Sequence, residues 1–399
     1  MAKQKQQKQQ KQQKQQKQPK EAPPPHQNKL TIDEGYMLAL LNRLLRTPSP
    51  TGMTDVIVAL VCKELDDLGI PFELTRRGAI RATLKGEVAA PARALVGHLD
   101  TLGATVKNIR ANGRLEIVPI GHWSARFAEG ARVNVFTDDG QIRGTILPLK
   151  ASGHTYNDEV DTQPSAWTNL EVRIDARTES AEETRALGVH VGDVVSVDAP
   201  PEFVKTGFIV CRHLDDKAGV AAMMTAARAI RKAKAKLPID CHLLFTLAEE
   251  IGVGASAVLH GDVSELVAVD NGTIAPGQNT STYGVTIAMQ DSAGPFDWHL
   301  TRNLIKLAQD NDIAHSRDVF RYYRSDGAAA VEAGNDIRAA LVCFGLDASH
   351  GWERTHKDSL MALAELLTLY MQSEPLFRRD QQALGPIGDL PPGDIEPRI

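Results

Sequence analysis

The sequence predicts an α/β protein in which a mostly parallel sheet is flanked by helices and interrupted by a small inserted β-barrel. Three observations favour this fold class. Short apolar runs alternate with segments of helical periodicity in residues 29–104 and 205–375. Between them, over residues 105–204, helical periodicity largely disappears and short alternating runs recur. Acidic and histidine motifs stand at or just past the ends of several apolar runs, as expected where strands end at a functional edge.

The first part of the chain contains two helix signals and then strand signals. Asp33 precedes apolar positions with helical spacing over residues 36–44, so we expect it to cap a helix. A second helix is expected over residues 54–68, with an apolar side made of Val56, Ile57, Leu60, Val61, Leu65 and Leu68. Apolar runs bounded by turn residues then predict strands at residues 72–74, 79–84 and 94–96.

The middle of the chain, residues 105–204, is expected to form the inserted barrel. Asp138-Asp139-Gly140 is typical of a tight turn between two of its strands. One helix is expected inside this part, over residues 180–187. Alternating runs predict strands at residues 114–118, 133–136 and 170–174.

After residue 205 the alternation of strands and helices returns. Strands are expected at residues 208–210 and 241–247, with a helix rich in small residues between them at 215–233. This alternation predicts strands that run mostly parallel, so that functional residues meet at their carboxyl ends. Further helices are expected at residues 296–308, 328–333 and 357–371.

The two ends of the chain differ from the rest in composition. Residues 1–28 are a Lys/Gln-rich run with three consecutive prolines and almost no apolar residues, so we expect a disordered tail. A basic tail that touches nucleic acid or another acidic surface is the alternative. Residues 376–399, which are rich in proline and glycine, are expected to form a flexible C-terminal tail.

The composition is that of a globular chain of 399 residues, with 42% hydrophobic residues, 24% charged residues and a net charge of −5. This charge gives no reason to expect nucleic acid as a partner, and no run of apolar residues is long enough to predict a membrane span. We expect free thiols in a reducing compartment, because no CxxC pair occurs among Cys62, Cys211, Cys241 and Cys343. With no secretory signal at the start, a cytoplasmic protein is expected.

An ordered series of acidic and histidine motifs carries the functional prediction. It consists of His98-x-Asp100, Asp215-Asp216, Glu249-Glu250, Asp270 and His350. Carboxylate and imidazole groups bind divalent cations, and a shared carboxylate can hold two cations close together. A further carboxylate can move protons. The set as a whole predicts a dinuclear metal hydrolase.

Each motif has a simpler interpretation when it is taken alone. The first motif can arise by chance, and Asp215-Asp216 can cap a helix whether or not it also binds a cation. Two adjacent carboxylates after the apolar run at 241–247 are harder to explain without a cation or solvent. His350 and His356 lie close together in the sequence, which leaves open which of them belongs to the series.

The motifs resemble those of the co-catalytic metallopeptidases that include glutamyl and deblocking aminopeptidases and the tetrahedral-shaped aminopeptidases. The resemblance covers residues 30–372 and is closest in three blocks, at residues 97–100, 214–219 and 245–252. It implies a zinc-peptidase-like catalytic domain made of residues 29–104 and 205–375, with the barrel as a dimerisation domain. In detail the chain is most similar to the branch associated with the osmoprotectant N-acetylglutaminylglutamine amide.

The resemblance implies two divalent metal ions per chain that share one bridging carboxylate. One ion would be held by His98, Asp215 and Asp270. The other would be held by Asp215, Glu250 and His350. Glu249 would act as the general base, and Asp100 would orient His98. Zinc is the expected metal, with cobalt or manganese as alternatives.

Some positions depart from the family pattern without removing a ligand. Thr101 stands for a frequent Glu and Lys217 for a frequent Arg, and the residues after His350 also differ. His350 is preferred to His356 as the last ligand because the helix that follows then keeps its family spacing. His154 in the insert is expected to be structural, although insert histidines of the family can reach an active site.

The expected activity is that of an aminopeptidase acting on small peptides, with a link to Gln-containing dipeptides of the osmoprotectant system. Because Thr101 removes an acid beside the site, we expect N-blocked substrates to be tolerated better than by relatives. A metal-dependent deacylase or carboxypeptidase of the same fold is the alternative, and Glu249 argues against a non-catalytic metal protein. We expect self-association through the insert, as a dimer or dodecamer, and expect neither a membrane nor nucleic acid as a partner.

Overall fold

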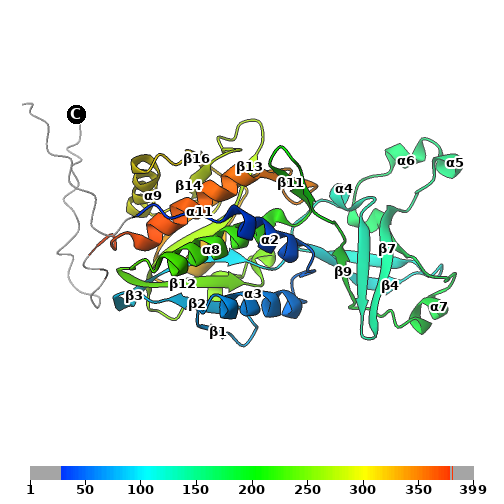
Figure 1. The fold of residues 1–399 in the computed structure, drawn as a ribbon. Helices are drawn as coiled ribbons and strands as arrows, with labels where there is room; N and C mark the ends of the chain where they lie inside the picture. Colours follow the sequence, from blue (N-terminus) through cyan, green and yellow to red (C-terminus); the bar gives the residue numbers. More distant parts are fainter. Residues whose placement is uncertain (1–27, 378–379, 381–399) are drawn as a thin grey trace, which may run out of the picture.

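A computed structural model describes residues 28–377 and residue 380. Figure 1 shows two parts, a large α/β part and a β-barrel at one end of it. The barrel interrupts the α/β part in sequence, which confirms the predicted fold class. The predictions for the two tails fall almost wholly outside the described residues. Within the described part of the chain, no helix is both long and apolar enough to cross a membrane.

The α/β part is built on a mixed sheet of twelve strands. Its centre is parallel, in the order β12, β3, β13 and β17, whereas most pairings toward its edges are antiparallel. The strands are β1 (Phe72–Leu74), β2 (Ile80–Leu84), β3 (Val88–His98), β10 (Glu202–Phe203), β11 (Phe208–Cys211), β12 (Ile239–Thr246), β13 (Val263–Ile274), β14 (Val285–Asp291), β15 (Gly294–Pro295), β16 (His315–Val319), β17 (Arg338–Asp347) and β18 (Glu353–His356).

Helices cover both faces of this sheet. One face packs against five of them, and α10 packs with Val96 and Ala268 on the other face. The small residues of α8 allow close packing, so this helix is buried along most of its length. The helices of this part are α2 (Glu34–Leu45), α3 (Asp55–Asp67), α8 (Leu214–Ala233), α9 (Trp298–Asp310), α10 (Asp326–Glu332) and α11 (Lys357–Gln372).

The first two helices begin at the residues that the sequence predicts. Asp33 caps α2, and its carboxylate accepts a hydrogen bond from the Tyr36 backbone N–H at 3.0 Å. Thr54 precedes α3. The prediction that Val56 belongs to the apolar side is wrong, because Val56 is 68% exposed while Val58 is buried. The buried side of α3 is therefore turned by about half a helical turn from that position.

Asp33→Ala is expected to destabilise the fold by about 1 kcal/mol, because it removes the cap of α2. The backbone of Tyr36 and the Arg228 guanidinium lower the pKa of Asp33 to about 2. The stabilisation is thus present above pH ~4, where Asp33 would be ionised even in the unfolded chain, and is lost as pH falls through this lowered pKa. Denaturant unfolding at neutral and acidic pH measures it. Asp33→Asn keeps an acceptor for the cap and should lose less unfolding free energy. An Asp33→Ala chain as stable as the parent would contradict this prediction.

The inserted part is a closed barrel of six strands, in the order β4, β5, β8, β7, β6 and β9. A helix forms within the range 180–187 that the sequence predicts, and Ser180 caps it, because its hydroxyl accepts from the Glu183 backbone N–H. Three further short helices lie in the loops between the strands. Their sequences show no helical periodicity, so they were not predicted. The strands are β4 (Gly103–Ile109), β5 (Leu115–Ile120), β6 (Arg132–Thr137), β7 (Gly140–Pro148), β8 (Leu170–Ile174) and β9 (Val194–Val197). The helices are α4 (Ala125–Ala128), α5 (Gly153–Tyr156), α6 (Glu159–Thr162) and α7 (Ala181–Ala186).

Candidate active site

The strand-borne residues of the predicted series lie together at one edge of the sheet. His98 is the last residue of β3, and Asp270 lies in the second half of β13, the parallel neighbour of β3. The Glu249–Glu250 pair follows β12, on the other side of β3, in a single 3-10 turn. Because these three strands are parallel, their carboxyl ends bring the side chains into one place.

Asp215 and His350 complete the site from α8 and from the connection between β17 and β18. The backbone of Asp215 is not helical, so this residue precedes the regular part of α8. The side-chain atoms that could bind a metal ion fall into two groups, here called the ligand groups, and within each group they lie within 4.8 Å of one another. One group consists of His98, Glu249 and Asp270. The other consists of Asp215, Glu250 and His350.

The carboxylate of Asp215 lies between the two histidines. Its Oδ1 is 3.1 Å from His98 Nε2, and its Oδ2 is 3.3 Å from His350 Nε2. The two oxygens of one side chain therefore face one histidine from each group. A carboxylate in this position has the geometry required to bridge two cations.

Burial perturbs the proton affinity of the whole cluster. Desolvation raises the pKa of Glu250 to about 8 and that of Asp270 to about 7, and it raises the pKa of Glu249 well above its usual value. Burial acts in the same direction on Asp215, but hydrogen bonds with His350 and His98 outweigh it and lower the pKa of that carboxyl. Carboxylates packed this closely need compensating positive charge, which divalent cations supply; the donor set therefore fits metal ions.

Asp100 holds its neighbours in a way that differs from the prediction. Its backbone carbonyl lies 2.9 Å from His98 Nδ1, whereas its nearest carboxylate oxygen is 3.6 Å away. The carboxylate instead accepts the backbone N–H groups of Glu249 and Glu250 at 3.2 and 3.3 Å, and the Thr51 hydroxyl at 2.7 Å. Asp100 thus orients His98 through the main chain and the Glu249–Glu250 turn through its side chain.

Asp100→Ala is expected to lower kcat/KM by about 10–100-fold, the usual effect of losing a group that orients metal-site residues. The loss arises because the Glu249–Glu250 turn loses its anchor, while His98 keeps its backbone partner. Asp100→Asn retains one acceptor oxygen and should be less impaired. Steady-state kinetics of the three chains tests this, and an Asp100→Ala enzyme with unchanged kcat/KM would contradict it.

Glu353 is a buried residue beside the site to which the sequence analysis gave no role. It is fully buried in β18, and its Oε2 accepts the backbone N–H groups of Leu214 and Asp215 at 2.7 and 3.2 Å. Its Oε1 accepts the backbone N–H of His350 at 3.0 Å. One carboxylate therefore fixes the main chain on both sides of the second group. The only feature of the sequence that could have indicated this role is its position three residues after His350.

Two further buried groups support the ligands. Asn271 donates from Nδ2 to Asp215 Oδ2 at 2.8 Å and to Asp270 Oδ1 at 3.2 Å. Asp216 accepts the backbone N–H of His98 at 3.2 Å. A Cβ at Gly219 would lie 2.1 Å from the Asp216 carboxylate, so only glycine leaves room for it.

Two of the departures from the family pattern, Thr101 and Lys217, are buried. Thr101 is 1% exposed, and its hydroxyl donates to the carbonyl of Leu102. Lys217 donates from Nζ to the carbonyl of Thr47 at 2.7 Å, and burial lowers its pKa to about 7. Both side chains therefore bind main-chain carbonyls and not the side chains of the ligand groups.

The alternative histidines lie elsewhere. His356 caps α11, and its ring packs against Phe208 and Tyr283. It belongs to neither of the two ligand groups. His154 is exposed on α5 and belongs to neither of the two groups. Of the three, only His350 lies in the cluster.

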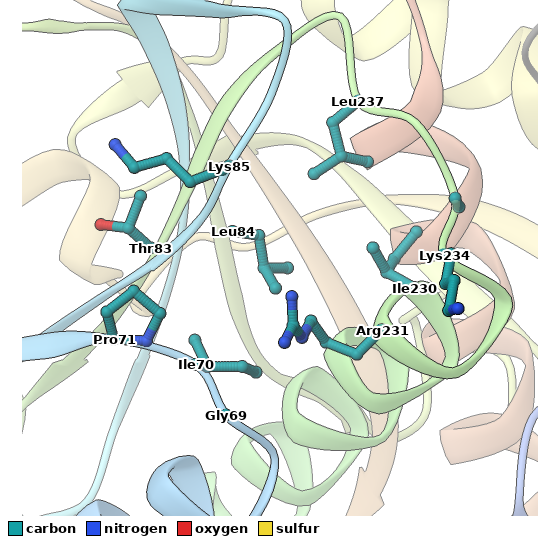
Figure 2. A pocket seen from close by; sticks show the side chains of 11 residues that line it. Gly69, Ile70, Pro71, Thr83, Leu84, Lys85, Ile230, Arg231, Lys234 and Leu237 are labelled. Atoms are coloured by element: carbon teal, nitrogen blue, oxygen red, sulfur yellow. The ribbon is translucent and has the colours of Figure 1, made fainter.

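A separate cavity of about 190 Å³ lies away from these residues. It is bounded by the segment between α3 and β1, the end of β2 and the last turn of α8. Figure 2 shows Arg231 extending from α8 toward Leu84. No residue of the two ligand groups lines this cavity, so it is not part of the candidate active site.

Carboxylates and imidazoles gathered at the carboxyl ends of parallel strands form a candidate site for metal-dependent hydrolysis. The model of the family "M42 glutamyl aminopeptidase" matches residues 78–366. The chain is 38% identical over 337 residues to the putative aminopeptidase YhfE of Bacillus subtilis, covering 84% of this chain and 97% of that protein. The chain therefore belongs to the M42 family and is a peptide-bond hydrolase; peptidases of this family are metal-dependent.

Solved structures share the fold. The TET aminopeptidase of Thaumarchaeota archaeon SCGC AB-539-E09 has a TM-score of 0.78 at 18% identity, over 84% of this chain and 96% of that one. The TET1 peptidase of Pyrococcus horikoshii, which assembles into a tetrahedron or a large octahedral shell, has a TM-score of 0.75 at 22% identity, over 84% and 99% of the two chains.

Proposed function

We propose that the chain is a dinuclear metallo-aminopeptidase that hydrolyses short peptides. The observation that carries this proposal is the carboxylate of Asp215, which faces His98 and His350 with one oxygen each. One divalent ion would be held by His98, Asp215 and Asp270. The other would be held by Asp215, Glu250 and His350. Zinc suits this donor set, as do cobalt and manganese.

Two cations bound there would supply the positive charge that activates water and polarises the scissile carbonyl. Glu249 would take the proton from the attacking water and pass it to the leaving amine. Its side chain is 14% exposed, compared with 4% for Glu250. This difference in exposure supports Glu249 as the base and Glu250 as the ligand, since a base must reach solvent and substrate whereas a ligand need not. Asp100 would hold both in register.

The metal and the reaction are tested separately. Metal analysis of the purified, dialysed chain should approach two equivalents, and activity removed by a chelator should return with zinc, cobalt or manganese. An activity screen then compares leucine p-nitroanilide with its N-acyl form. Hydrolysis of the free-amino substrate supports an aminopeptidase. Release of the acyl group from the N-acyl form, or of the last residue from a peptide with a free carboxyl terminus, would instead favour the alternative, a metal-dependent deacylase or carboxypeptidase of the same fold.

We further propose a link to Gln-containing dipeptides of the osmoprotectant system, supported by the sequence resemblance alone. The comparison is kcat/KM on Gln-Gln amide and on its N-acetyl form. Thr101 is buried, so tolerance of an N-blocked substrate would have to come from the lower charge beside the site and not from direct contact. Strong activity on leucine p-nitroanilide with none on either Gln compound would reject this link.

Self-association through the barrel, as a dimer or dodecamer, is also part of the proposal. The assembly of the TET1 relative into closed shells supports it. Light scattering of the purified chain gives the size, and a chain that is monomeric at all concentrations would reject it. A cytoplasmic location is supported by the free thiols of the described residues.

A further inference from the structure

A loop of the barrel reaches the second ligand group. Residues 120–128 run from the end of β5 into α4, at the junction of the two parts in Figure 1. The carbonyl oxygen of His122 lies 2.8 Å from His350 Nδ1. A carbonyl can only accept, so Nδ1 carries the proton and donates it. The lone pair of the ring is thereby left on Nε2, which faces Asp215 and Glu250.

The residue before His122 packs against the other ligand of this group. Gly121 has a φ of +80°, and a Cβ built on it would lie 3.3 Å from the carbonyl oxygen of Glu250 and 3.5 Å from Glu250 Cβ. The same Cβ would lie 2.5 Å from Leu102 Cδ2. The main chain of the loop therefore packs against Glu250, while the tightest contact of an added Cβ would be with the Leu102 side chain.

Contacts of the residues that follow His122 fix the loop in place. Trp123 donates from Nε1 to the carbonyl of Gly103 at 3.0 Å within the barrel. Arg212, which precedes α8, donates from Nη2 to the carbonyl of Phe127 at 2.7 Å. Its guanidinium carbon is 5.8 Å from the ring centres of both Trp123 and Trp352. The loop is thus tied to the barrel and to the catalytic part at once.

Among the described residues, no contact from the barrel loop reaches the first ligand group. His98 is held by Asp100 and Asp216, and Asp270 by Asn271, all of which belong to the α/β part. The barrel therefore contacts the two groups unequally. We therefore expect the metal affinity of the second group, but not that of the first, to depend on the barrel loop.

We propose that the inserted barrel positions the ligands of the second metal, with Gly121 and the His122 carbonyl as positioning residues for Glu250 and His350. The inference rests on the proposed dinuclear function. It gives the insert a task inside each chain, in addition to any self-association. The first metal, held by the α/β part alone, is independent of this loop.

The test is the affinity of each site for Zn²⁺ in the full-length chain, measured by competition with a chromogenic chelator. Gly121→Ala adds a Cβ that meets Leu102 and lies beside Glu250, so the loop must shift, and the second site should weaken by about 10–100-fold, the usual effect of disturbing a group that orients a ligand. The first site should be unchanged. Gly130→Ala is the matched control, because Gly130 has a φ of +78° with nothing within 4 Å of its Cβ. The control introduces the same backbone strain without a contact.

A second variant guards against a misfolded Gly121→Ala. Arg212→Met removes the tie between the loop and the catalytic part, and it should also weaken the second site. Loss of a cation near the metals would by itself favour metal binding, so the expected sign identifies positioning as the cause. Two Zn²⁺ sites in the parent with no weakening of the second site in either variant would overturn the inference alone. Fewer than two sites in the parent would overturn the proposed function and this inference with it.

Discussion

Glu249→Gln is expected to lower kcat/KM by about 10²–10⁴-fold, the range that a general base contributes. The substitution keeps the size of the side chain and removes its capacity to accept a proton from water. Metal content should remain that of the parent, because Glu249 is assigned to proton transfer. Single-turnover and steady-state assays on leucine p-nitroanilide, with metal analysis of the same samples, measure both quantities.

Glu250→Gln is the matched comparison, since the two glutamates are adjacent and share Asp100 as an anchor. This variant should lose the second metal ion, whereas Glu249→Gln should not. Glu249 also lies within ligand distance of His98 and Asp270. If Glu249→Gln loses metal, Glu249 is a ligand; if its activity falls by less than about tenfold, or 1.4 kcal/mol of barrier, it is not the base.

Asp215→Asn is expected to abolish binding of both metal ions, and with it the activity. Its two carboxylate oxygens face one histidine from each ligand group, and an amide offers only one acceptor oxygen. Asp270→Asn changes the first group alone, so it should lose one equivalent of metal and keep the other. Metal analysis after dialysis distinguishes the two variants.

The comparison also tests the number of metals. A stable Asp270→Asn enzyme with one metal ion and full activity would mean that a single site is sufficient. A chain in which Asp215→Asn keeps both ions would remove Asp215 from the bridging position. Each variant should be checked by thermal unfolding, since these carboxylates are buried among their neighbours.

Local signals determined the elements that the sequence predicted well. Asp33 and Ser180 cap helices because their side chains satisfy N–H groups within the next three residues, a contact that the sequence itself encodes. The barrel was recognisable for a similar reason, because alternation with period two reports strands with one buried face. Val56 was misplaced because helical periodicity identifies an apolar side only approximately when apolar residues occur on both sides.

The ordered motifs also predicted which residues gather at the site. Ligands placed after apolar runs meet whenever those runs become parallel neighbours, which follows from the topology of an α/β sheet. The sequence left His350 and His356 open, and the structure separated them because one lies before β18 and the other caps α11. That distinction depends on where the chain turns after β17.

The sequence by itself determined the fold class, the caps and the set of acidic and histidine residues, because each depends on near neighbours or on a repeating pattern. Only the tertiary structure decided what holds that set together. Glu353 joins Asp215 to His350, Asp100 supports the Glu249–Glu250 turn, and the barrel carbonyl of His122 meets His350. These contacts link residues more than a hundred positions apart in most cases, and they are backbone hydrogen bonds or shared carboxylates that no local periodicity encodes.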